Sequence, residues 1–183
     1  MMSGAAQWVD ERLIGPGARP AERVVGYATG VLGGVLAGAG AVGAGWSSPA
    51  VAVVAVVAFD LFGGAAVNAT SVAKRHFHRP GRTARHHLGF VAVHVQPFLL
   101  ALVVPGFGWG TAAVVYALAL TAALAVTRTP AGPQRRPLAF AVTVLAIAAA
   151  TLVSTVPDEL AWFTPVLLIK LLLAHLLPED TAP

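Results

Sequence analysis

Histidine is the most unevenly distributed residue type in this chain of 183 residues. Five of the six histidines fall between positions 76 and 94. Imidazoles near a carboxylate or an amide are common ligands of zinc, iron and copper. The spacing lacks the HxxxH and HxxHH boxes of membrane di-iron enzymes, and HExxH is absent. The sequence names no cofactor, and a metal stays an open hypothesis, with His76, His78, His86, His87 and His94 as its ligands.

Two opposite charges lie at matching positions in two apolar segments. Asp60 is about ten residues into segment 50–73, and Lys170 is about ten residues into segment 160–177. An ionised side chain at the centre of a bilayer costs at least ~2.5 kcal/mol, so it needs a partner. We therefore expect the two to pair, either as an ion pair that fixes helix register or as a proton or ion relay.

Further polar side chains continue from Asp60 toward one membrane face. Asn68 follows Asp60 by two helical turns, and an amide in hydrocarbon needs a hydrogen-bond partner. His87 and His94 are seven residues apart, which predicts one shared helix face, with His94 about 10 Å inside the membrane. These residues predict a site built from Asp60, Asn68, His87 and His94.

Three classes of function are compatible with these residues. In an enzyme, His94 or His87 acts as general base, Asn68 orients the substrate, and the cationic groups bind an anionic lipid headgroup or a small substrate. Those cationic groups are Arg75, Arg85 and Lys170. In a transporter or channel, Asp60 and Lys170 form a relay near the midplane. In a non-catalytic membrane subunit, the chain binds a partner helix through glycines.

The composition is that of a membrane protein. Hydrophobic residues make up 57% of the chain and charged residues 11%, whereas soluble proteins have about 25% charged residues. Cysteine is absent, which excludes disulfides and thiolate metal sites. The net charge of +4 follows the membrane topology and forms no single basic face, so we expect contact with anionic lipid headgroups and not with nucleic acid.

Six apolar segments approach the ~20 residues that a membrane-spanning helix needs. They predict an all-α bundle of six transmembrane helices, at residues 24–45, 50–73, 88–104, 109–126, 138–155 and 160–177. Residues 1–23 and 178–183 are then short segments outside the membrane. The first segment is longer than the apolar part of a signal peptide, which favours a retained helix over a cleaved one. Pro97 is expected to kink the third helix.

Basic residues predict the orientation of the bundle. Eleven of the twelve occur before the first segment, between the second and third, or between the fourth and fifth. Cytoplasmic loops retain Lys and Arg, so both termini are expected in the cytoplasm. Trp46, Trp109 and Trp162 fall at the opposite boundary, where indole rings favour the headgroup layer. Arginine outnumbers lysine ten to two, which favours a bacterial plasma membrane.

Glycine and the N-terminus add two smaller predictions. Gly26, Gly30, Gly34 and Gly38 repeat every fourth residue, a spacing that allows close approach of a second helix. Gly63 and Gly64 offer a matching surface within the chain, and a partner helix or a second copy of the protein is the alternative. Residues 5–14 mix apolar and charged side chains and fit a short interfacial helix or a frayed terminus.

Overall fold

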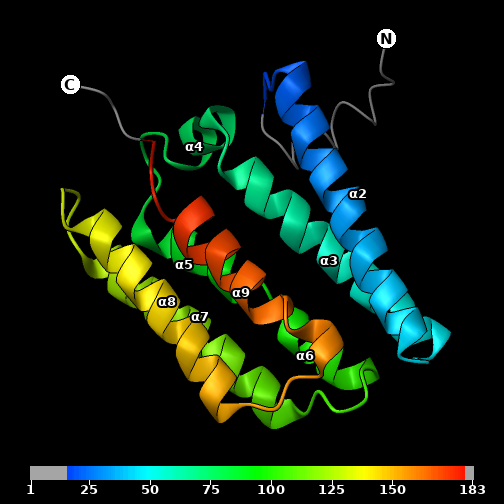
Figure 1. Ribbon diagram of the computed structural model, residues 1–183. Helices are drawn as coiled ribbons and strands as arrows, with labels where there is room; N and C mark the ends of the chain where they lie inside the picture. The colour runs from blue at the N-terminus through cyan, green and yellow to red at the C-terminus, as the bar shows by residue number, and fades with distance from the viewer. Residues whose placement is uncertain (1–15, 180–183) are drawn as a thin grey trace.

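The computed structural model describes residues 16–179, and this part of the chain is helical without a strand (Figure 1). The predicted interfacial helix at residues 5–14 lies outside the described residues. The long helices are α2 (Pro20–Gly43), α3 (Ser48–Asn68), α7 (Trp109–Arg128) and α8 (Arg135–Val153). The shorter ones are α4 (Ser71–Phe77), α5 (Ala84–Ala92), α6 (Gln96–Val103), η1 (Asp158–Leu160), α9 (Phe163–Leu168) and η2 (Ile169–His175).

Five segments of the described chain are long and apolar enough to cross a membrane, which supports a membrane location. They are α2, α3, the combined stretch Ala84–Val103, α7 and α8. The segment predicted as a sixth span is different. It consists of the three-residue turn η1, the six-residue α9 and the seven-residue π-helix η2. At 1.5 Å per residue, α9 and η2 extend only about 20 Å.

Helices α2 and α3 form an antiparallel hairpin at one side of the bundle (Figure 1). Side chains on α3 approach the glycines of α2 so closely that a Cβ atom on Gly30 would lie 3.0 Å from the ring of Phe59. A Cβ on Gly34 would lie 3.0 Å from the carbonyl oxygen of Ala55. The glycine face of α2 therefore contacts α3 of the same chain.

The short segment α9–η2 lies at the centre of the bundle, between α3 on one side and α7 and α8 on the other (Figure 1). Most of its leucines belong to the buried core, with Leu168 and Leu172 fully inaccessible. By contrast, lipid-facing side chains such as Leu36 and Leu152 are 71% and 85% exposed. Because it is enclosed by protein, this segment can hold polar groups and irregular backbone that lipid would not tolerate.

The third predicted helix is interrupted. The chain leaves the helix at Val93–Val95, between α5 and α6, and Pro97 stands in the first turn of α6. Proline is accepted there because its missing N–H needs no partner, so the predicted kink takes the form of a break before Pro97. The second predicted helix ends early for a similar local reason. The Thr70 hydroxyl accepts a hydrogen bond from the Ala73 amide and starts α4 in a new direction.

The two ends of the bundle differ in the connections that they carry. The turns after α2, α6 and α8 lie at one end, and the turn after α7, together with α4 and the end of η2, lies at the other (Figure 1). The second end contains Lys74, Arg75, Arg128, Arg135 and Arg136, and we call it the basic end.

Candidate functional site

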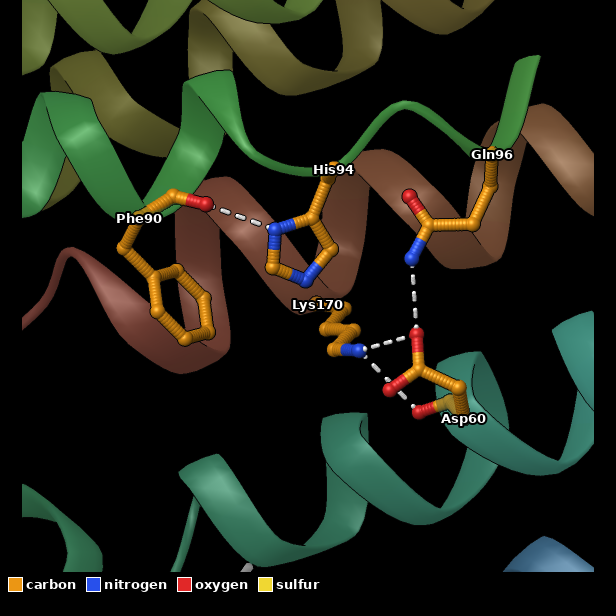
Figure 2. A network of polar contacts seen from close by, with 5 residues as sticks. All are labelled: Asp60, Phe90, His94, Gln96 and Lys170. Carbon is orange, nitrogen blue, oxygen red and sulfur yellow. Dashed lines mark hydrogen bonds and ion pairs between the residues drawn. The ribbon is translucent and has the colours of Figure 1, made fainter. Parts of the chain in front are cut away.

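The centre of the candidate site is an ion pair between α3 and η2. The Lys170 ammonium lies 2.8 Å from Asp60 Oδ2 and also donates to the Asp60 carbonyl oxygen at 3.1 Å (Figure 2). The Lys170 side chain is 3% exposed, whereas that of Asp60 is 46% exposed. The pairing expected from matched depth is therefore present, and the lysine is its buried partner.

Gly64 gives Lys170 its path to Asp60. A Cβ atom at Gly64 would lie 2.5 Å from Lys170 Cε and 2.8 Å from Nζ. The lysine stem therefore crosses α3 at a glycine, because any larger residue would occupy the space of the stem. Gly63, one residue earlier, contacts α2, where a Cβ would lie 3.1 Å from the Gly26 carbonyl oxygen. Of the two adjacent glycines, Gly63 thus allows close contact with α2 and Gly64 with Lys170 of η2.

The break between α5 and α6 brings two more polar groups to the pair (Figure 2). Gln96, the first residue of α6, donates from Nε2 to Asp60 Oδ2 at 2.9 Å. His94, inside the break, places Nδ1 2.6 Å from the Phe90 carbonyl oxygen. A carbonyl only accepts, so His94 carries its proton on Nδ1, and a neutral ring then has a free lone pair on Nε2.

A cavity of about 220 Å³ joins these groups. Asp60, Asn68, His94 and Lys170 all line it, together with aromatic side chains from four helices. Asn68 is 5% exposed, and its Nδ2 finds no acceptor among the described residues. The lining continues from Asp60 to Asn68 and Phe77, the last residues of α3 and α4, so the cavity extends toward the basic end.

His87 lies outside this cavity and belongs to a second group of imidazoles nearer the basic end. Its Nδ1 is 3.2 Å from Nε2 of His175, and its ring stacks on that of His78 at a centroid distance of 4.6 Å. His78 donates from Nε2 to the His175 carbonyl oxygen at 2.9 Å. His87 lies within α5 and His94 in the break that follows it, so the two are not on one continuous helix as expected.

The environment of His78 favours its neutral form. Burial is the largest cause that lowers the pKa of His78 below 6.5, and the positive charges of Lys74 and Arg135 lower it further. The hydrogen bond to the His175 carbonyl acts in the opposite direction and raises the pKa. The lowering causes prevail, so His78 is neutral at pH 7.

The two arginines expected at the mouth of the site lie elsewhere. Arg75 is exposed and forms an ion pair with Glu179 at 3.5 Å, and Arg85 is exposed beside His86. Neither lines the Asp60 cavity. The five histidines named as metal ligands also do not converge: His86 bonds to Thr83, and His76 packs against Phe77. Between residues 16 and 179, no three such side chains are placed to hold a metal ion.

Sequence reasoning missed two residues that the site depends on. Gln96 is a polar residue inside an apolar run. Such a residue needs a hydrogen-bond partner, and the expected Asp60–Lys170 pair could have suggested Asp60 as that partner. Gly64 gave no signal beyond its neighbour Gly63. Comparison of the chain with protein-family models, curated proteins and solved structures found no match. The geometry of the site is therefore the basis for a functional proposal.

Proposed function

We propose that this protein is a small proton-translocating transporter of the bacterial plasma membrane, with the Asp60–Lys170 pair and His94 as its proton-binding site. In this proposal the basic end faces the cytoplasm, as the distribution of Lys and Arg indicates. The stretch Ala84–Val103 counts as one span and α9–η2 as the sixth crossing, so both termini are cytoplasmic.

The observation that carries the proposal is the shared cavity of a carboxylate, a buried ammonium and an imidazole with a free lone pair. Ionisable groups at membrane depth that face a protein interior are typical of proton pathways. A proton on Asp60 removes the charge that holds Lys170, and a proton on His94 adds a second cation to the cavity. Either event weakens the link between the α2–α3 hairpin and η2.

The break at His94 and the π-helix at Lys170 also support a transporter. Transporters commonly place substrate and ion sites at interrupted helices, where unwound backbone is enclosed by protein. Here both interruptions meet at one ion pair. The α2–α3 hairpin and the central segment are therefore the two bodies that we expect to move against each other.

The imidazoles of His175, His87 and His78 extend from the cavity region toward the basic end. The Phe90 ring contacts the rings of both His94 and His175, at centroid distances of 4.6 and 3.7 Å. A proton that moves from His94 to His175 must pass this ring, which lies against both imidazoles and has no polar atom to carry the proton. We assign to Phe90 the role of a gate between the two groups of imidazoles.

An enzyme is the second candidate function, and one specific observation favours it. An enzyme requires Asp60, Asn68 and His94 to converge, and all three line the same cavity. His94 Nε2 would act as general base, and the unpartnered Asn68 amide would bind a substrate oxygen. The positions of Arg75 and Arg85 count against an anionic headgroup in this cavity, so the substrate would be a small neutral or zwitterionic molecule.

Proton flux separates the two candidates. Purified protein is reconstituted into pyranine-loaded liposomes, and a potassium gradient with valinomycin drives protons inward. We expect flux above that of protein-free liposomes, a loss of at least about tenfold in Asp60→Asn and His94→Gln, and normal flux in Asp158→Asn, a matched change in an exposed turn. Flux equal to that of empty liposomes, or flux unaffected by Asp60→Asn, contradicts the proposal.

A further inference from the structure

A second cavity, of about 460 Å³, lies at the basic end and shares no lining residue with the Asp60 cavity. Its walls come from α4, the start of α8 and the end of η2. The small side chains of Ala65 in α3 and Ala69, directly after α3, also line it. The proton-translocation proposal makes no use of this space.

Three cationic side chains from two helices line this cavity: Lys74, Arg135 and Arg136. Lys74 donates to the carbonyl oxygens of Ala174, in η2, and of Leu177, just after η2, so its charge is held in the cavity wall. Arg135 has a buried Nε that finds no acceptor among residues 16–179. Buried donors in proteins are nearly always hydrogen-bonded, so this Nε can donate to an acceptor that a ligand supplies.

Another part of the lining is apolar and exposed on the surface of the bundle. Phe140 and Ile169 belong to it and are 47% and 41% exposed. Phe140 follows Arg135 by five residues, which places it about 7.5 Å deeper along α8. Cationic groups at headgroup level above an apolar wall match a molecule with an anionic head and a hydrocarbon chain.

We propose that this cavity binds the phosphate group of an anionic glycerophospholipid. Arg135 and Arg136 contact the phosphate oxygens, because a guanidinium donates two parallel hydrogen bonds to such a group. Lys74 adds a fixed positive charge, and one acyl chain lies along Phe140 and Ile169. Glu179 is the one anionic side chain in the described lining, and its ion pair with Arg75 holds it at the rim.

The test is a count of bound lipid by native mass spectrometry on the full-length protein in detergent. Dioleoyl phosphatidylglycerol is titrated against dioleoyl phosphatidylcholine for the wild type, Arg135→Gln, Arg136→Gln and Arg128→Gln. Arg128 is the matched control, since it is exposed at the end of α7 and does not line the cavity. We expect one tightly bound phosphatidylglycerol, with affinity about tenfold weaker in Arg135→Gln and Arg136→Gln and unchanged in Arg128→Gln.

Further variants and a second probe remove the remaining ambiguities. Arg135→Lys keeps the charge but loses the planar fork, and we expect an affinity between that of the wild type and that of Arg135→Gln. Circular dichroism confirms that each variant is folded. Equal losses in Arg128→Gln and Arg135→Gln, or equal affinity for the two lipids, overturn the site. Inorganic phosphate that competes as strongly as the lipid overturns the lipid assignment and points to free phosphate.

Discussion

Two parts of this bundle satisfy their polar groups in different ways. Helices α7 and α8 run unbroken for 20 and 19 residues, and most of their threonine hydroxyls bond to carbonyls of their own helix. Thr127 donates to the Ala123 carbonyl at 2.8 Å, and Thr143 donates to the Ala139 carbonyl at 2.6 Å. The stretch α5–α6 and the segment α9–η2 are interrupted or widened, and they carry His94, Gln96 and Lys170. We call these the regular half and the irregular half.

The difference shows where a membrane bundle can keep strongly polar groups. A broken helix frees backbone carbonyls, and each one needs a donor in a low-dielectric environment. At the end of α5 the freed carbonyls find such donors: His94 bonds to Phe90, and Tyr116 of α7 donates to Ala92 at 2.7 Å. Polar side chains thus satisfy the irregular backbone, and the irregular backbone in turn positions them. The regular half contains no broken helix, so it frees no carbonyls that need such donors.

The largest effect is expected from separating the ion pair. Asp60→Ala leaves the Lys170 ammonium buried without a counter-charge, and removing one partner of such a pair costs about 3–5 kcal/mol of unfolding free energy. Lys170→Met should cost about half as much, because the Asp60 carboxylate is partly exposed and keeps its bond to Gln96. Chemical or thermal unfolding in detergent measures both.

The double variant Asp60→Ala with Lys170→Met isolates the interaction between the two residues. We expect it to be more stable than the sum of the single losses predicts, by about 1–3 kcal/mol. Thr127→Val, in the regular half, is the control and should change the unfolding free energy by less than about 0.5 kcal/mol. A decrease in unfolding free energy for Thr127→Val as large as that for Asp60→Ala would contradict the distinction between the two halves.

The second effect concerns the room that Gly64 leaves for Lys170. A methyl group at Gly64 displaces the lysine stem, and overpacking of this kind costs about 1–3 kcal/mol. Gly110→Ala in α7 is matched, since a Cβ there meets nothing within 4 Å, and it should be neutral or slightly stabilising. The same unfolding measurement applies. If Lys170→Ala does not relieve the defect of Gly64→Ala, the clash has another origin.

The third effect tests whether the break depends on the regular half. Tyr116→Phe removes the donor to the Ala92 carbonyl and leaves a freed oxygen without this partner, at a cost of about 1 kcal/mol. Amide hydrogen exchange should rise at Val93–Val95 and stay unchanged in α8. Thr121→Val is the control on the same helix, because the carbonyl to which Thr121 donates is part of a continuous helix. Equal effects of the two changes would show that the break is stable without Tyr116.

The sequence predicted the regular half well and the irregular half only in part. Hydropathy located α7 and α8 within a few residues, because their apolar runs are long and lack ionisable residues. Hydropathy also assigned Leu160–Leu177 to one long helix, although η1, α9 and η2 share that range. The reason is that hydropathy reports burial from water and not backbone regularity. Leucines enclosed by protein, such as Leu167, Leu168, Leu171 and Leu172, contribute as much hydropathy as leucines that face lipid.

For the candidate site, matched depth was enough to pair Asp60 with Lys170, because both side chains needed a partner in hydrocarbon. Sequence spacing failed for His87 and His94, since the seven-residue rule assumes a continuous helix and the chain breaks at Val93. Arg75 and Arg85 were expected at the site from proximity in sequence alone. Phe77 of α4 does line the Asp60 cavity, but Arg75 of the same helix is exposed and pairs with Glu179, and Arg85 is exposed in the first turn of α5.

The smallest effect is a pH dependence at His78, which follows α4 and contacts His87 and His175 of the irregular half. The pKa of His78 is below 6.5 in the folded protein, chiefly because of burial, so the unfolded chain binds more protons than the folded one just below pH 6.5. Stability should therefore be constant well above pH 6.5, fall as the pH drops from about 6.5 toward the lower folded pKa, and level off below that pKa. His78→Gln should reduce the decrease in melting temperature between about pH 7.5 and about pH 5.5. His86→Gln, an exposed neighbour bonded to Thr83, is the matched control. An equal reduction in both variants would place the acid sensitivity on the loop and not on the buried imidazoles.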